Sequence, residues 1–221
     1  MEKTAKKPDK TAFFLPAFPG TSIEVFSMSD GQPPKLRGYA ALYNVFSEDL
    51  GGYRTRIAPG AFDRVVPGSD VRLLVNHDSN LLLGRTASGT LSLTLDDKGL
   101  YFQGQPPLTD FAAHYVEAIR RGDMSGCSFS CDINTDLDEW DWTGDVPVRT
   151  INQITALYDV GPVTVPAFSQ TDVAAYALEA ARTAFDAAQV ALEAARAVER
   201  EAEARRARRA RALFLSVSLG L

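Results

Sequence analysis

The sequence predicts an α+β fold: a mostly antiparallel β-barrel with flanking helices, followed by a long C-terminal α-helix. Three observations lead to this fold class. Apolar and polar residues alternate with a period of two over much of residues 36–168, as in short half-buried strands. One internal segment, residues 110–121, follows a helical period instead. Beyond residue 172 the composition shifts to Ala, Glu and Arg, which are strong helix formers.

These patterns divide the 221 residues into three parts. Residues 1–34 contain Lys, Pro and Ser without a sustained period, which predicts a mostly flexible arm ending at Pro33-Pro34. Residues 35–170 are expected to form the folded domain, and a hydrophobic content of 45% is enough for a core. Residues 171–221 are expected to form a helical tail.

Charge and hydropathy narrow the classes of partner. The formal net charge of −5 at pH 7 argues against a nucleic-acid-binding surface on the chain as a whole. No apolar run approaches the about 20 residues of a membrane-spanning helix. Pro16 interrupts the apolar residues 13–15 before they reach the length of a signal-peptide core. We therefore expect a cytoplasmic protein without nucleic-acid or membrane partners.

Two short segments show the strand period most clearly. Each has an apolar residue at every second position: Leu91, Leu93 and Leu95 in one, and Val71, Leu73 and Val75 in the other. A turn sequence at residues 96–99 follows the first segment, so a hairpin with a return strand from Leu100 is expected. His77 is next in phase after the second segment and is expected at the end of that strand.

Residues 110–121 are expected to form an amphipathic helix, because four apolar residues share one face. These residues are Phe111, Ala112, Tyr115 and Ile119. Gly122 follows them, and glycine is typical of a helix C-terminus because it adopts the left-handed conformation without strain. His114 lies off the apolar face of this helix.

The tail repeats at heptad spacing. The sequence Ala-Leu-Glu-Ala-Ala-Arg occurs at residues 177–182 and again at 191–196, two heptads apart. Steps of three and four residues separate the apolar positions Leu178, Ala181, Phe185, Ala188, Leu192 and Ala195. This spacing is typical of a coiled-coil seam. Because half of the seam is Ala, it buries little apolar surface and predicts only weak self-association through the C-terminal helix.

The two cysteines, Cys127 and Cys131, do not predict a disulfide. On one extended strand their Cα atoms would lie about 13 Å apart, whereas a disulfide requires less than about 7 Å. Both are expected to face the apolar side of the strand, where a desolvated thiol is inert as a nucleophile. A zinc site is not indicated either, because the two histidines are distant and the carboxylates are spread along loops.

Three other residues carry the candidate chemistry: His77, Ser128 and Asp159, each at or near the end of a strand-like run. A serine hydroxyl is a weak nucleophile until a base takes its proton, and the base needs a third group to fix its tautomer. A period of two places Ser128 on the strand face opposite Cys127 and Phe129. Its hydroxyl is therefore expected to be exposed to substrate.

The segments around these residues resemble the tailed-bacteriophage prohead maturation proteases, distant relatives of herpesvirus assemblin. The matching segments are Asn76-His77-Asp78 with Leu83-Gly84-Arg85, Pro59-Gly60-Ala61-Phe62, Ser125-Gly126-Cys127-Ser128-Phe129-Ser130, and Leu157-Tyr158-Asp159-Val160-Gly161 with Val165-Pro166-Ala167-Phe168. The resemblance implies an assemblin-like barrel with a catalytic site of three residues. In that site Ser128 is the nucleophile, His77 the base and Asp159 the carboxylate that orients the base.

The sequence departs from the family pattern in two places. Asp159 stands where Glu is usual, so His77 is expected to lie closer to the backbone that carries the carboxylate. Ser130 and Cys131 stand where Gly and an aromatic residue are commoner. Assemblin uses a second histidine as its third residue, but His114 precedes Ser128 and matches no family motif.

The resemblance implies a serine endopeptidase that acts inside an assembling procapsid in the host bacterial cytoplasm. It would cut the scaffolding protein, or the scaffold region of the major capsid protein, and then itself, without a cofactor. A second interpretation stays open, namely a non-catalytic capsid assembly or scaffold protein that acts through its C-terminal helix. A small-molecule esterase is disfavoured because the sequence lacks a Gly-x-Ser-x-Gly turn. Backbone amides and Arg149 are both candidates for binding the oxyanion.

Overall fold

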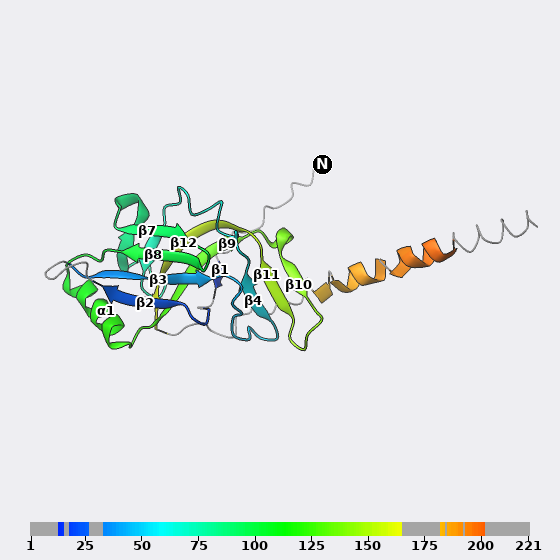
Figure 1. Cartoon of the computed structure of the whole chain (residues 1–221), viewed down its shortest axis with the longest axis horizontal. Coiled ribbons are helices and arrows are strands. Elements are labelled where there is room, and N and C mark those ends of the chain that lie inside the picture. Colours follow the sequence, from blue (N-terminus) through cyan, green and yellow to red (C-terminus); the bar gives the residue numbers. More distant parts are fainter. Residues whose placement is uncertain are drawn as a thin grey trace, which may run out of the picture. The chain divides into compact units, whose positions relative to one another are not determined.

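The chain divides into two units, Met1–Thr171 and Asp172–Leu221, which are described separately. The computed structural model describes residues 13–15 (backbone), 18–26 and 33–164, and residues 182–201 except 184 and 192. In these ranges the first unit contains twelve strands and one α-helix (Figure 1). The result is a mixed α+β architecture in which most strand pairs are antiparallel.

The largest sheet, here called the site sheet, has the strand order β1-β9-β12-β5-β6. Its members are β1 (Phe13–Leu15), β9 (Gly126–Ile133), β12 (Ile154–Val163), β5 (Arg72–Leu74) and β6 (Leu82–Arg85). β12 runs antiparallel to β9 and parallel to β5. The sheet therefore places side by side the three segments that contain or precede the candidate residues.

The second sheet is antiparallel throughout and has the order β2-β3-β8-β7. Its members are β2 (Ser22–Phe26), β3 (Lys35–Leu42), β8 (Gly99–Gly104) and β7 (Leu91–Leu95). β7 and β8 form the expected hairpin, and the carboxylate of Asp96 accepts the N–H groups of Lys98 and Gly99 in its turn. This local hydrogen bonding is what the turn sequence predicts.

The third sheet has the order β10-β11-β4 and lies at the end of the first unit opposite the α-helix (Figure 1). Its members are β10 (Glu139–Asp141), β11 (Val148–Ile151) and β4 (Arg54–Ile57), and β4 is parallel to β11. Two short 3₁₀ helices, η1 (Thr86–Ser88) and η2 (Thr135–Leu137), complete the described elements of this unit.

Helix α1 spans Asp110–Arg121, as expected. The side chain of Thr109 caps its N-terminus by accepting the Ala112 N–H, and Gly122 ends it with a φ of 83°. Its buried residues include Ala112 and Ile119 from the expected apolar face. The helix packs beside β2 and covers one end of the core (Figure 1).

The core lies where β9 packs against β2 and β3. Phe129 of β9 is fully buried, and its ring meets that of Phe62 edge-to-face with centroids 5.3 Å apart. Cys127 and Cys131 are also fully buried free thiols. The apolar face of β9 therefore points into the core, as its period of two predicts.

One expectation about the fold is wrong, and another is not confirmed. Part of the N-terminal arm expected over residues 1–34 forms strands, because β1 pairs with β9 and β2 pairs with β3. β1 is only three residues long and shows no period, whereas β2 carries a short alternation at Ile23 and Val25 that the expectation of a flexible arm overlooked. The expected mostly antiparallel β-barrel is not confirmed, because the described strands form three separate sheets and none closes on itself.

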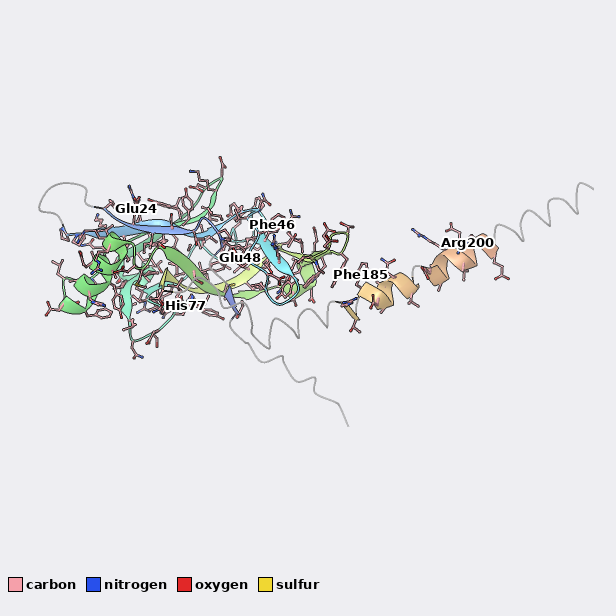
Figure 2. All side chains as sticks on the ribbon, turned by 90° about the horizontal axis from the view of Figure 1, so that it is seen from below. Glu24, Phe46, Glu48, His77, Phe185 and Arg200 are labelled. Carbon is pink, nitrogen blue, oxygen red and sulfur yellow. The ribbon has the colours of Figure 1, made fainter. Side chains whose placement is uncertain are left out.

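In the second unit the described residues are helical. Residues 185–191 and 193–201 form the helical segments from which Phe185 and Arg200 project (Figure 2). Every described residue of this helix is exposed, including the seam positions Phe185, Ala188 and Ala195. The seam positions Leu178, Ala181 and Leu192 lie outside the described residues.

Candidate active site

Ser128 lies near the start of β9, with Gly161 of β12 as its cross-strand partner. The expectation that Ser128 is exposed is wrong, since the residue is only 3% exposed. β9 is an interior strand between β1 and β12, and the His77 side chain contacts the Ser128 hydroxyl. A period of two separates the two faces of a strand, but it does not say what covers the polar face.

His77 follows β5 but does not continue its pleat. Asn76 and His77 both have positive φ values, 51° and 59°, which turn the chain sharply after the strand. The Asn76 N–H donates to the Pro162 carbonyl at 2.9 Å, and its side-chain oxygen accepts the N–H of Thr164, also at 2.9 Å. These bonds hold the His77 turn against the C-terminal end of β12 (Figure 2).

Two successive hydrogen bonds join the three candidate residues. The distance from His77 Nδ1 to Asp159 Oδ1 is 2.5 Å, and that from His77 Nε2 to Ser128 Oγ is 3.0 Å. Since an ionised carboxylate only accepts hydrogen bonds, Nδ1 is assigned the proton and Nε2 its lone pair. The Ser128 hydroxyl then donates to Nε2, which is the arrangement needed to remove its proton.

Asp159 lies inside β12. Its side chain is 7% exposed, and that of His77 is 15% exposed. Burial of this kind excludes competing water and strengthens the attraction between the carboxylate and the imidazole N–H. The aspartate therefore holds the imidazole ring in place.

Two residues without a proposed role in the sequence analysis complete the surroundings. Ser130, two residues after Ser128, donates its hydroxyl to Asp159 Oδ2. A period of two places both serines on one strand face, so a signal for Ser130 was present in the sequence. The role of Asn76 depends on a positive φ and on residues near the end of β12, and no period reveals it.

The other residues that the sequence offered for a chemical role do not take part in this hydrogen-bonded path. His114 is exposed on α1, where its ring contacts Tyr115. Burial raises the pKa of the Cys127 and Cys131 thiols, so neither is a ready nucleophile. Arg149 is buried in the third sheet, where its Nε and Nη2 donate to Asp138 Oδ2 at 2.7 and 2.5 Å. That pairing holds Arg149 in a structural contact with Asp138.

The described residues contain neither a metal-binding cluster nor a membrane-spanning helix. No group of three or more His, Cys, Asp or Glu side chains among them is placed to hold a metal ion. No helix in the described part of the chain is long and apolar enough to cross a membrane. Residues 165–168, which include the Pro166-Ala167 pair, lie outside the described residues.

Comparison with known proteins identifies the family of the chain. No curated protein and no solved structure matches the chain. The model of the caudovirus prohead serine protease family matches residues 21–185, which include every described strand except β1. The matched region contains Ser128, His77 and Asp159 together with the strands that bring them into contact. The chain thus belongs to the caudovirus prohead serine protease family.

Proposed function

We propose that this protein is a serine endopeptidase of procapsid maturation, with Ser128 as nucleophile, His77 as base and Asp159 as orienting carboxylate. The observation that carries the proposal is the unbroken hydrogen-bonded path from Ser128 Oγ through His77 to Asp159. Membership of the prohead serine protease family supports the same reaction class.

The first half of the reaction forms an acyl-enzyme. Ser128 Oγ attacks the scissile carbonyl carbon while its proton passes to His77 Nε2, and Asp159 stabilises the resulting imidazolium. The tetrahedral intermediate collapses by breaking the C–N bond. His77 returns the proton to the leaving amine, so the new N-terminus departs neutral and the imidazole is again a base.

In the second half, water replaces the departed amine. His77 takes a proton from this water, and the hydroxide attacks the ester carbonyl on Ser128. Collapse of the second intermediate breaks the C–Oγ bond, and His77 returns the proton to Ser128. The cycle needs no metal or redox group, since every proton removed from a nucleophile is given to a leaving group.

We propose the scaffolding protein, or the scaffold region of the major capsid protein, as the substrate, and this chain itself as a further one. The place of action is the interior of the procapsid in the cytoplasm of the host bacterium. Cleavage there would clear the interior of the shell. The helical tail is proposed to bring the enzyme to its place by weak association with another helix.

Co-expression with the major capsid protein of the same phage tests the proposal. Wild type is expected to shorten the capsid protein on a gel, and the Ser128→Ala variant is expected to leave it full-length. Ser125→Ala is the matched control, because Ser125 is exposed three residues upstream on the same segment. Equal processing by wild type and Ser128→Ala would remove Ser128 from the mechanism.

Labelling with a fluorophosphonate separates an enzyme from a non-catalytic scaffold protein. An activated serine attacks the phosphorus atom, whereas an ordinary hydroxyl does not. Wild type and Ser125→Ala are expected to be labelled at Ser128, and Ser128→Ala and His77→Ala are expected to stay unlabelled. Absence of label and of cleavage in wild type would favour the scaffold interpretation.

A further inference from the structure

We infer that Ser130 is a positioning residue for the same site, which fixes the Asp159 carboxylate so that it presents one oxygen to His77. The inference rests on the proposed function and adds a fourth residue to the hydrogen-bonded path. Ser130 lies on β9 with Asp159 of β12 as its direct cross-strand partner. Its hydroxyl donates to Asp159 Oδ2.

Both oxygens of Asp159 are therefore engaged. Oδ1 accepts the imidazole N–H of His77, and Oδ2 accepts the Ser130 hydroxyl. Ser130 and Asp159 are 2% and 5% exposed, so water has little access to replace either bond. The torsion that rotates a carboxylate about its Cβ–Cγ bond has broad minima. A second fixed partner is what restricts this rotation.

The strand pairing explains why Ser130 is suited to this task. Ser128 and Ser130 share one face of β9, so one rigid element carries the nucleophile and the anchor of the carboxylate. A register shift in β12 lies between Leu157 and Asp159, directly before the carboxylate. A register shift of this kind is typical of a β-bulge, and a bulge redirects a side chain. The Ser130 hydroxyl then holds the redirected Asp159 side chain in place.

Ser130 is a positioning residue and not a second nucleophile. Its proton is donated to Asp159, whereas the hydroxyl bonded to His77 Nε2 is that of Ser128. Loss of the Ser130 hydroxyl leaves Asp159 Oδ2 buried without this donor. The carboxylate then rotates or shifts to recover a partner, and the imidazole loses its fixed orientation during proton transfer.

Kinetic comparison of Ser130→Ala, Ser130→Thr and Ser47→Ala tests the inference with a peptide that spans the capsid-protein cleavage site. Ser47 is the matched control, because it is a buried serine, 3% exposed, whose hydroxyl bonds to backbone groups away from the three residues. We expect kcat of Ser130→Ala to fall about 10- to 100-fold, the range for a hydrogen bond to a charged group. KM is expected to stay within about twofold, because Ser130 is not proposed to touch substrate.

Ser130→Thr keeps the hydroxyl and is expected to recover most of kcat. Ser47→Ala is expected to lower thermal stability without lowering kcat per folded molecule. An unchanged kcat in Ser130→Ala, or an equal fall in Ser47→Ala, would overturn the inference.

NMR of the histidine rings tests whether Ser130 positions Asp159, without any proteolysis. The chain has two histidines, so isotope-labelled histidine gives ring signals from His77 and the exposed His114 alone. In a Ser128→Ala background, the Nδ1 proton of His77 is expected far downfield, as in a short bond to a carboxylate. Adding Ser130→Ala is expected to broaden or shift this signal, and adding Ser47→Ala is not.

The kinetic and the spectroscopic measurements distinguish a failure of the proposed function from a failure of the inference about Ser130. If wild type cleaves nothing, the proposed function fails, and the histidine signal still decides whether Ser130 positions Asp159. If wild type cleaves but Ser130→Ala leaves kcat unchanged, only the inference about Ser130 fails.

Discussion

Gly161 of β12 lies so close to Leu74 of β5 that a Cβ atom added to it would be 1.8 Å from the Leu74 carbonyl oxygen. The two strands are parallel neighbours, with Asp159 paired to Arg72. Two residues before Gly161 the chain carries Asp159, and three residues after Leu74 it carries His77. The close approach at Gly161 therefore sets the spacing between the carboxylate and the imidazole.

Gly161→Ala is expected to destabilise the protein and to reduce activity further than the loss of folded protein explains. The added methyl group forces β12 and β5 apart, and overpacking of this kind costs about 1–3 kcal/mol. In a protein of this size each kcal/mol lowers Tm by roughly 2–4 °C. Gly144→Ala is the control, since the nearest atom to its added Cβ is 3.7 Å away. Thermal unfolding and the cleavage rate of the folded fraction measure the two effects, and an unaffected Gly161→Ala would show that the strands adjust.

Replacement of the two histidines is expected to have opposite outcomes. His77→Ala should be as damaging to cleavage as Ser128→Ala, because residues of one catalytic unit fail together. His114→Ala should cleave normally, since His114 is exposed on α1. The rate at which each variant shortens the capsid protein measures its cleavage activity. An inactive His114→Ala with a fully active Asp159→Asn would instead make His114 the third residue.

Asp159→Asn is expected to reduce the cleavage rate by up to roughly 10⁴-fold while the fold is retained. The amide brings one acceptor and one donor to a position where His77 and Ser130 both donate. The imidazole then shifts its proton to Nε2 and no longer accepts from Ser128. Asp132→Asn is the matched control, because the Asp132 carboxylate accepts from Tyr158 on the same strand pair. A rate within tenfold of wild type in Asp159→Asn would contradict the orienting role.

Much of the fold was predictable because its signals are local. Alternation at Leu91, Leu93 and Leu95 with a turn sequence identifies the β7–β8 hairpin, and helical spacing with Gly122 identifies α1. The three candidate residues also follow from short segments, and the structure brings their side chains into contact. Periodicity and turn chemistry depend only on neighbouring residues, so the sequence displays them directly.

The remaining features depend on contacts between distant segments. The burial of Ser128 depends on the His77 side chain and on the strands that flank β9. The turn at His77 depends on two left-handed residues and on hydrogen bonds to the end of β12. The pairing of β2 with β3 places Ile23 in the core, and the partner strand is not revealed by the short alternation at Ile23 and Val25. Each of these features depends on a partner outside the residue's own segment.

The ion pair between Arg149 and Asp138 yields a stability prediction outside the site. Their side chains are 6% and 2% exposed, and Asp138 Oδ1 has no hydrogen-bond partner among the described residues. Arg149→Met is expected to cost about 3–5 kcal/mol, because it leaves a buried carboxylate unpaired. Adding Asp138→Leu should recover most of this loss, and urea unfolding of both variants measures it. Equal stability of the single and double variants would show that the unpaired Asp138 carboxylate is not the cause of the loss.

The loss of folding stability in Arg149→Met is also expected to depend on pH. Burial already raises the pKa of the Asp138 carboxyl against the effect of Arg149, and removal of the guanidinium raises it further. A raised pKa in the folded state means that the folded protein binds this proton more tightly than the unfolded chain. The destabilisation is therefore smallest below the unfolded value of about 4 and grows as the pH rises through the folded pKa. A loss that is constant between about pH 4 and 7 would contradict this account.

Truncation of the tail is expected to separate cleavage from incorporation. The second unit begins at Asp172, and its described helical residues are all exposed, so a chain that ends at Ala175 should still cleave substrate in solution. It should enter procapsids poorly, because weak docking through a seam with few large residues depends on the length of helix that remains. A chain that ends at Asp186 keeps the whole family-matched region and serves as the comparison. If only the shorter chain loses activity, residues 176–186 belong to the catalytic unit. If both chains enter procapsids normally, the helix serves as a spacer.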